Sequence, residues 1–327
     1  MTEWEGLRPF PSLLRTFLTS GTTIYNAAHH RFALFLATAT FALIVAGALV
    51  TSHDAGLAVP DWPTSFGSLY KIPPMVGGVK WEHGHRMVAQ FVGFLTIIMA
   101  VWTWRVDRRR WMRWLAWSAL GLVIFQGILG GITVLFFLPW YVSTAHAAFA
   151  QTFFSVTVLM ALFTSRRWIE ASPAGAAESR TPSVQHLAML AVASLYVQLF
   201  TGAGFRHSGF GFLPHLVTAV FVTAALLWAI TRVLSQHSAI AGLRRPALCL
   251  LGLLVTQLGL GFAAYLTRVE WGREAVQPMP SMVASTVAHV ATGAMLLATS
   301  FVLMAQAHRH VARAAQPAVA SRKAVTA

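Results

Sequence analysis

The chain has 327 residues, of which 56% are hydrophobic and only 10% are charged. Soluble proteins contain about 25% charged residues, and a chain with 12% aromatic residues and so little charge is the opposite of a disordered one. The composition therefore excludes a water-soluble domain and a disordered chain, and it indicates an integral membrane protein. The net charge of +14 would suit nucleic-acid binding, so its distribution along the chain has to be considered.

Eight stretches of the chain are long and apolar enough to cross a membrane as helices, which requires about 20 residues each. They are predicted at 32–52, 84–104, 112–136, 143–164, 185–204, 212–231, 246–266 and 282–306. We therefore predict an all-α integral membrane protein with eight transmembrane helices.

The positions of the basic residues predict the orientation of these helices. With both termini in the cytoplasm, 18 Arg and Lys residues fall on the cytoplasmic side and six on the outer side. Because cytoplasmic loops carry the excess of positive charge, we expect a cytoplasmic N-terminal segment 1–31, a flexible cytoplasmic tail 307–327 and a location in the cell inner membrane. Segment 1–31 does not have the pattern of a cleaved signal peptide. The excess positive charge then needs no nucleic-acid partner.

A polar segment, 165–184, divides the helices into an N-terminal bundle, 32–164, and a C-terminal bundle, 185–306. The third and seventh helices share a glutamine followed by glycines, at Gln126 and Gln257. The fourth and eighth helices both place a histidine just after a Ser-Thr pair. This spacing predicts two tandem, pseudo-symmetric four-helix bundles. The small residues would also permit close contact between helices of two copies of the chain.

The sequence contains 13 histidines, and their depth along the helices separates them into groups. Six lie at predicted cytoplasmic ends or loops, where we expect solvated rings: His29, His30, His186, His237, His308 and His310. His53 and His207 are expected in outer loops. The other four lie inside the second, fourth, sixth and eighth helices, toward their outer ends: His85, His146, His215 and His289. Ionisable groups in a membrane usually face a partner or cofactor.

Two histidines per bundle favour one kind of cofactor. Structural zinc sites need four protein ligands, whereas haem iron needs two axial ligands on opposite faces of a flat apolar ring. Helical bundles build such sites from side chains on facing helices. We therefore predict a haem-type site in each bundle, toward the outer face, with His85 and His146 as iron ligands in one and His215 and His289 in the other.

The two predicted sites differ in their polar neighbours. Glu82, His85 and Arg86 are three and four residues apart and share one face of the second helix. In the sixth helix, Phe212 and Leu216 stand in place of the acid and the arginine. Glu82 has two interpretations: an acid at the helix start paired with Arg86, or a carboxylate for proton transfer. Arg86 also suits a haem carboxylate. The adjacent His83 points away from this face and is expected at the membrane interface.

A long outer loop, 53–81, precedes this motif and contains the pattern G-L-x-x-P-D-W-P at 56–63. Its Gly and Pro residues indicate an ordered loop. This loop could be either a lid over the first site or a plain connector. Together with the E-x-x-H-R motif at Glu82, the three other helix histidines and the tandem bundles, the loop resembles the heme A synthase family over about 32–306.

The resemblance implies an oxidoreductase that converts the C8 methyl group of heme O to a formyl group by two successive hydroxylations, through an alcohol and a gem-diol that loses water. It implies that His85 and His146 hold the substrate haem, that Glu82 is the catalytic carboxylate, and that His215 and His289 ligate a heme B that transfers electrons. Expected partners are heme O, a membrane electron donor, a heme O synthase and terminal oxidase subunits.

Two alternatives remain open from the sequence. A bis-His two-haem electron-transfer cytochrome would need the four histidines but gives no reason for Glu82 on the ligand face. A non-catalytic haem carrier or oxidase assembly factor would need only one exchangeable site. Many members of the resembling family carry cysteine pairs in outer loops, whereas the single cysteine here, Cys249, is predicted inside a helix. A thiol-dependent step is therefore not expected.

Overall fold

The computed structural model describes residues 23–178, 180–274, 276 and 278–313. Eight long helices account for most of this range, and all eight are long and apolar enough to cross a membrane. They are α2 (Ala27–Ser52), α3 (Val79–Val106), α4 (Arg110–Leu135), α5 (Trp140–Thr164), α7 (Val184–Arg206), α8 (Phe212–Gln236), α9 (Ala241–Tyr265) and α10 (Pro280–His310). The predicted class, an all-α protein with eight apolar helices, is confirmed.

Local sequence explains where several helices begin. The side chain of Asn26 accepts a hydrogen bond from the backbone N–H of His29 at the start of α2, and Ser183 does the same for His186 at the start of α7. Such caps satisfy backbone donors that have no partner inside the helix. Pro280 opens α10, a position where its missing N–H costs nothing.

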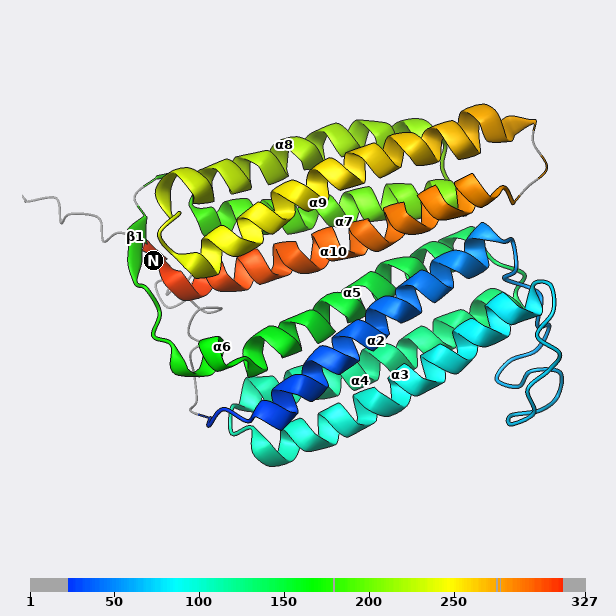
Figure 1. Ribbon diagram of the computed structural model, residues 1–327, viewed down its shortest axis with the longest axis horizontal. Helices are drawn as coiled ribbons and strands as arrows, with labels where there is room; N and C mark the ends of the chain where they lie inside the picture. The colour runs from blue at the N-terminus through cyan, green and yellow to red at the C-terminus, as the bar shows by residue number, and fades with distance from the viewer. Residues whose placement is uncertain (1–22, 179, 275, 277, 314–327) are drawn as a thin grey trace, which may run out of the picture.

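The helices form two stacks of four, one containing α2, α3, α4 and α5 and the other α7, α8, α9 and α10 (Figure 1). The loop that follows α2 lies beyond one end of the stacks, which we call the loop end. Helices α2 and α10 respectively begin and finish at the opposite end, which we call the terminal end (Figure 1). The two ends of the helical region therefore lie at the same end of the stacks, while the location of both termini in the cytoplasm stays a prediction.

Each stack has its own apolar core. Leu36, Met99 and Met112 are fully buried in the first, and Leu226 and Leu250 in the second. A smaller buried cluster joins the stacks through α2, α5 and α10, where its members are Ile44, Phe154, Ala294 and Ala298. The two stacks are therefore separate bundles that share one apolar interface.

The terminal end is more ordered than the sequence suggested. The predicted linker contains a short helix, α6 (Arg166–Glu170), and a strand, β1 (Ala176–Glu178), which pairs in parallel with β2 (Val311–Arg313). Helix α10 continues to His310, and Ala307 and Val311 are buried. The expectation of a flexible tail is therefore wrong for 307–313, because these residues pack against the linker. Residues 314–327, and residues 1–22 of the N-terminal segment, lie outside the described residues.

At the loop end, α9 is followed by a π-helical turn, Leu266–Glu270, and a 3-10 turn, Trp271–Arg273. Cys249 lies within α9, as predicted, and its side chain is exposed on the helix surface.

Candidate functional site

The four helix histidines all lie in the loop-end half of their helices, on α3, α5, α8 and α10, and each one packs against a glycine of the preceding helix. A Cβ atom on that glycine would lie 3.1 Å from Cε1 of His85, 3.4 Å from Cε1 of His146, 2.6 Å from Cε1 of His215 and 3.0 Å from Cε1 of His289. The four glycines are Gly47, Gly130, Gly202 and Gly261. We call them the seat glycines, because each imidazole ring rests against a position without a side chain. An added Cβ atom would overlap the ring at Gly202, crowd it at Gly47 and Gly261, and make an ordinary contact at Gly130.

The seats also orient the rings. In all four cases Cε1 is the ring atom closest to the glycine, followed by Nδ1, and Nε2 is either farther away or beyond 4 Å. The Nδ1–Cε1 edge of each ring therefore faces the neighbouring helix. The buried Nδ1 atoms of His85, His146 and His289 have no hydrogen-bond partner among the described residues. Because Nδ1 faces the neighbouring helix, Nε2 is the ring nitrogen that a ligand could reach.

In the second bundle the two histidines face each other directly. The ring centroids of His215 and His289 are 6.3 Å apart, and the ring planes are nearly perpendicular, at 81°. Metal–imidazole bonds are about 2 Å long, so two rings that bind one metal ion from opposite sides have centroids about 6 Å apart. The spacing of this pair therefore fits a shared axial metal such as haem iron.

Glutamine residues accompany three of the four histidines, two of them through their side chains. Gln198 donates to Nδ1 of His215 at 3.1 Å, and Gln257 donates to Nε2 of His289 at 3.2 Å. The backbone of Gln126 interacts with His146, and the amide nitrogen of the Gln126 side chain is buried without a partner among the described residues. Because a glutamine side chain has several rotatable bonds, Gln257 can leave Nε2 of His289 without movement of the backbone.

The seat pattern includes residues that sequence reasoning did not single out, namely Gly47, Gly202 and Gln198. A usable signal exists, because a glutamine precedes the seat glycine by four residues in α4, α7 and α9. In α2 this position is Leu43. The spacing puts the glutamine and the glycine on one helix face, one turn apart.

The first bundle places its histidines on α3 and α5, where His85 and His146 are within electrostatic range of one another. The described residues contain no group of three or more His, Cys, Asp or Glu side chains arranged to hold a metal ion. This donor set fits a planar cofactor that needs two protein ligands better than it fits an ion bound by side chains alone.

Glu82 and Arg86 form a buried ion pair on α3, with 2.6 Å between Nη2 of Arg86 and Oε1 of Glu82. The predicted shared face is thus confirmed for Glu82 and Arg86. The second carboxylate oxygen, Oε2, accepts the backbone N–H of Val59 at 2.8 Å. Arg86 also donates to the backbone carbonyls of Val59, Asp61 and Thr64, at 3.2, 2.7 and 3.0 Å. Both side chains therefore anchor the loop to the start of α3.

The loop, 53–78, is also closed by its own contacts. The carboxylate of Asp61 accepts hydrogen bonds from the Thr64 hydroxyl and from the backbone N–H groups of Phe66 and Gly67. Desolvation acts to raise the pKa of Asp61, but these hydrogen bonds outweigh it and lower the pKa to about 2. Trp62 packs on α4, where a Cβ atom on Gly131 would lie 2.5 Å from its ring. The loop is an ordered cap on the first bundle.

Some histidines lie elsewhere than the sequence suggested. His83 is buried under the loop, with Nδ1 3.0 Å from Oγ of Ser65, so its expected interfacial position is wrong. Three of the six rings expected to be solvated are also buried, because the helices and the linker pack over them. They are His29, His237 and His308. His237 contacts the buried Glu178 of β1 at 3.1 Å.

The two expected outer-loop histidines follow α2 and α7 directly. The ring of His53 stacks on Trp81, with centroids 4.1 Å apart. Burial, and then the charges of Arg206, His146 and Arg268, lower the pKa of His207 to about 4. His207 is therefore neutral near pH 7, close to the cationic side chains of Arg206 and Arg268.

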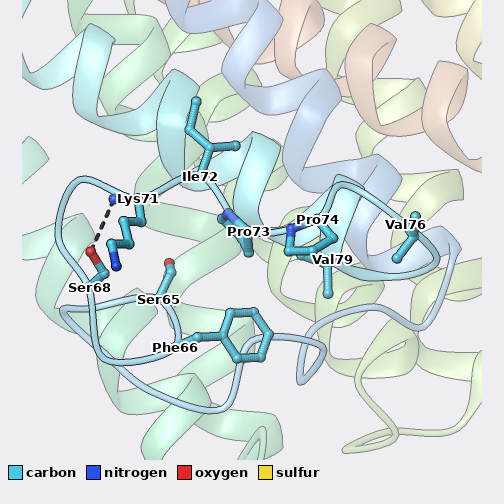
Figure 2. A pocket seen from close by; sticks show the side chains of 9 residues that line it. All are labelled: Ser65, Phe66, Ser68, Lys71, Ile72, Pro73, Pro74, Val76 and Val79. Atoms are coloured by element: carbon cyan, nitrogen blue, oxygen red, sulfur yellow. Dashed lines mark hydrogen bonds between the residues drawn. The ribbon is translucent and has the colours of Figure 1, made fainter.

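A cavity of about 470 Å³ opens on the loop itself. Figure 2 shows that its lining comes from the stretch between Ser65 and Val79 and includes Phe66, Lys71 and Ile72. None of the four helix histidines lines this cavity. It is a feature of the loop surface, separate from the histidine pairs.

The fold and the site define a class: a multi-pass helical membrane protein with a pair of seated histidines in each of two four-helix bundles. Residues 78–214 match the COX15-CtaA family, described as cytochrome oxidase assembly protein. This range includes Glu82, His85, Arg86 and His146 and ends one residue before His215.

Several curated proteins that resemble the chain are named heme A synthase. The chain is 31% identical to the heme A synthase of Shouchella clausii over 173 residues, 51% of this chain and 55% of the relative. It is 27% identical to the heme A synthase of Alkalihalophilus pseudofirmus over 172 residues, with the same coverage of each. The chain spans about half the length of the curated relatives it matches. Over about half of its length the chain is therefore similar to the COX15-CtaA family and to proteins named heme A synthase.

Proposed function

We propose that this protein is a heme A synthase, an oxidoreductase that converts the C8 methyl group of heme O to a formyl group by two successive hydroxylations. The observation that carries the proposal is the repeated arrangement of two histidines on seat glycines, with a carboxylate beside the pair in the first bundle only. The equivalent positions in the second bundle are Phe212 and Leu216. The two sites share the histidine and glycine arrangement but differ in the neighbouring side chains, which suits one substrate site and one electron-transfer site.

In the first bundle, His85 and His146 would hold the iron of heme O from opposite sides. Glu82 lies one turn from His85 on the same helix, in reach of the proton movements that methyl oxidation requires. Arg86 would keep Glu82 in place while it holds the loop over this end of the bundle. The loop would then exclude water from the reacting edge of the substrate.

In the second bundle, His215 and His289 would bind heme B. When bound, this group supplies one-electron transfer. The seat glycines Gly202 and Gly261 fix both rings, and the glutamines Gln198 and Gln257 lie beside them as polar partners. The conversion of a methyl to a formyl group is a four-electron oxidation, so an electron-transfer site within the same chain has a direct use.

The cellular setting follows from the same proposal. The cytoplasmic excess of Arg and Lys supports a multi-pass protein of the cell inner membrane with both termini in the cytoplasm and the histidine pairs toward the outer face. A heme O synthase would supply the substrate, terminal oxidase subunits would receive the product, and a membrane donor would exchange electrons with the heme B site.

The experiment that tests the proposal is the extraction of haems from the full-length protein, purified from cells that also make heme O, followed by chromatography and mass analysis. The expected result is heme B together with heme O, its alcohol or heme A. Heme B alone, at two per chain, would overturn the synthase proposal.

A second candidate function, a bis-His electron-transfer cytochrome, is favoured by one specific observation. Both carboxylate oxygens of Glu82 are already engaged, one by Arg86 and the other by Val59. Glu82 thus has a structural role that requires no chemistry. The same extraction separates the two candidates, because only the synthase binds a farnesylated haem and converts it.

A further inference from the structure

Arg206 lies at the junction of the two bundles, near the loop end. Its Nη2 donates to Oγ of Ser52 on α2 at 2.7 Å and to the carbonyl of Ala48 at 3.5 Å. Oγ of Ser52 lies 3.0 Å from Oγ1 of Thr286 on α10. The guanidinium of a residue on α7 of the second bundle is therefore held against α2 of the first bundle, whose Ser52 also contacts α10.

Arg206 lies near the second histidine pair, on its loop-end side. Arg206 follows the seat glycine Gly202 by four residues, so the two lie on one face of α7. Thr286 precedes His289 by three residues on α10, which places it one turn toward the loop end. Arg206 is also within electrostatic range of His289.

Arg206 has unused binding capacity. A guanidinium has five N–H donors, and the contacts recorded for Arg206 within the described ranges use only Nη2. No carboxylate lies within salt-bridge distance of it there; Asp54 is close enough to act electrostatically, but its side chain is exposed. Arg268, a second cation, is also within electrostatic range. Cations near a membrane core normally have an anionic partner.

The opposite direction along the second bundle offers no such partner. Beyond the histidine pair, toward the terminal end, the bundle interior is the apolar cluster that includes Leu226, Ile230 and Leu250. A carboxylate placed there would be buried without a cation, which is strongly unfavourable. An anionic edge of any ligand between His215 and His289 must therefore face the loop end.

We infer that Arg206 is the carboxylate-binding residue of the second bundle, and that it fixes the orientation of the bound porphyrin with its carboxylate edge toward the loop end. The guanidinium fork suits a carboxylate in geometry and charge. Arg268 adds to the positive potential at the same edge. The inference rests on the proposed haem site in this bundle, and it adds a residue that the histidine motifs did not indicate.

A binding comparison tests this inference without reference to catalysis. The full-length chain is prepared from haem-depleted cells in a His85→Ala background, so that the second pair is monitored by its absorption spectrum. It is titrated with ferric heme B and with heme B dimethyl ester, in which both carboxylates are blocked. We expect tighter binding of the free acid, and we expect Arg206→Gln to reduce its affinity at least tenfold, equivalent to about 1.4 kcal/mol, while the ester is unaffected.

Three control variants make the result specific. Arg206→Lys keeps the charge and should retain most of the preference for the free acid. Ser52→Ala removes a hydrogen-bond partner of Arg206 but no charge, so the preference should persist. Arg166→Gln removes an exposed arginine on α6, 73% exposed in its side chain, and should change nothing.

The outcomes separate the two proposals. Equal loss of acid and ester binding in Arg206→Gln, or no preference for the free acid in the parent protein, overturns the role of Arg206 while the haem site stands. Absence of a bis-histidine haem spectrum in the parent protein with either ligand overturns the haem site and this inference together.

Discussion

His215 lies so close to Gly202 that one added methyl group would displace its ring: a Cβ atom on Gly202 would be 2.6 Å from Cε1 and 2.8 Å from Nδ1 of His215. Both atoms belong to the rigid imidazole ring, and Gly202 lies on a packed helix. The glycine therefore determines where the ring, and its Nε2, can lie.

Gly202→Ala is expected to remove the haem of the second bundle and leave the first bundle occupied. Overpacking of this kind costs about 1–3 kcal/mol, and moving the His215 ring by a fraction of an ångström disturbs the facing geometry with His289. The measurement is the absorption spectrum and haem content of the purified variant. Gly252→Ala is the matched control, since nothing lies within 4 Å of its added Cβ. Unchanged haem content in Gly202→Ala would show that the seat does not position the ligand.

Glu82→Gln is expected to retain both haems and the loop structure and to reduce product formation by about 10²–10⁴-fold. Glutamine can still accept the N–H of Val59, and Arg86 loses its ion pair with residue 82 but keeps its contacts with three loop carbonyls, so the loop stays anchored while the ionisable group is removed. The measurement is heme A formed per protein in cells that make heme O. Full activity of Glu82→Gln would assign Glu82 to loop anchoring alone.

Gly131→Ala is expected to release the loop from α4. The added Cβ would lie 2.5–2.8 Å from three ring atoms of Trp62, so the indole must leave its position at a cost of about 1–3 kcal/mol. Limited proteolysis of 53–78 and tryptophan fluorescence would report the change. Gly127→Ala, one turn away on the same helix with no atom within 4 Å of the new Cβ, controls for helix propensity. Equal cleavage rates in both variants would contradict the predicted role of the Trp62 contact.

Acid should open the loop only near the pKa of Asp61, which hydrogen bonding lowers to about 2. Because the folded pKa is below the ordinary value, the stabilisation from this carboxylate is complete above about pH 4 and is lost as pH falls through about 2. Pepsin cleavage of the loop between pH 5 and pH 2 measures this. Asp61→Asn should be cleaved more readily at pH 5, and a cleavage profile identical to that of the parent would show that the Asp61 contacts do not close the loop.

The sequence by itself determined the eight apolar helices, because a membrane span requires a long apolar stretch and nothing else in the chain provides one. Periodicity along single helices also determined the shared face of Glu82, His85 and Arg86, since residues three and four apart are neighbours in any α-helix. The parallel order of the two bundles followed from the repeated glutamine, glycine and histidine positions.

Only the tertiary structure decided which residues meet between helices. The contact of His215 with His289, the seats at Gly47 and Gly202, and the reach of Arg206 to Ser52 join residues that are 13 to 154 positions apart in the chain. Hydropathy does not encode such contacts, because they depend on the rotation and depth of each packed helix. The burial of His83, His237 and His308 under a loop and a linker is of the same kind: their surroundings come from segments whose folding the local sequence does not determine.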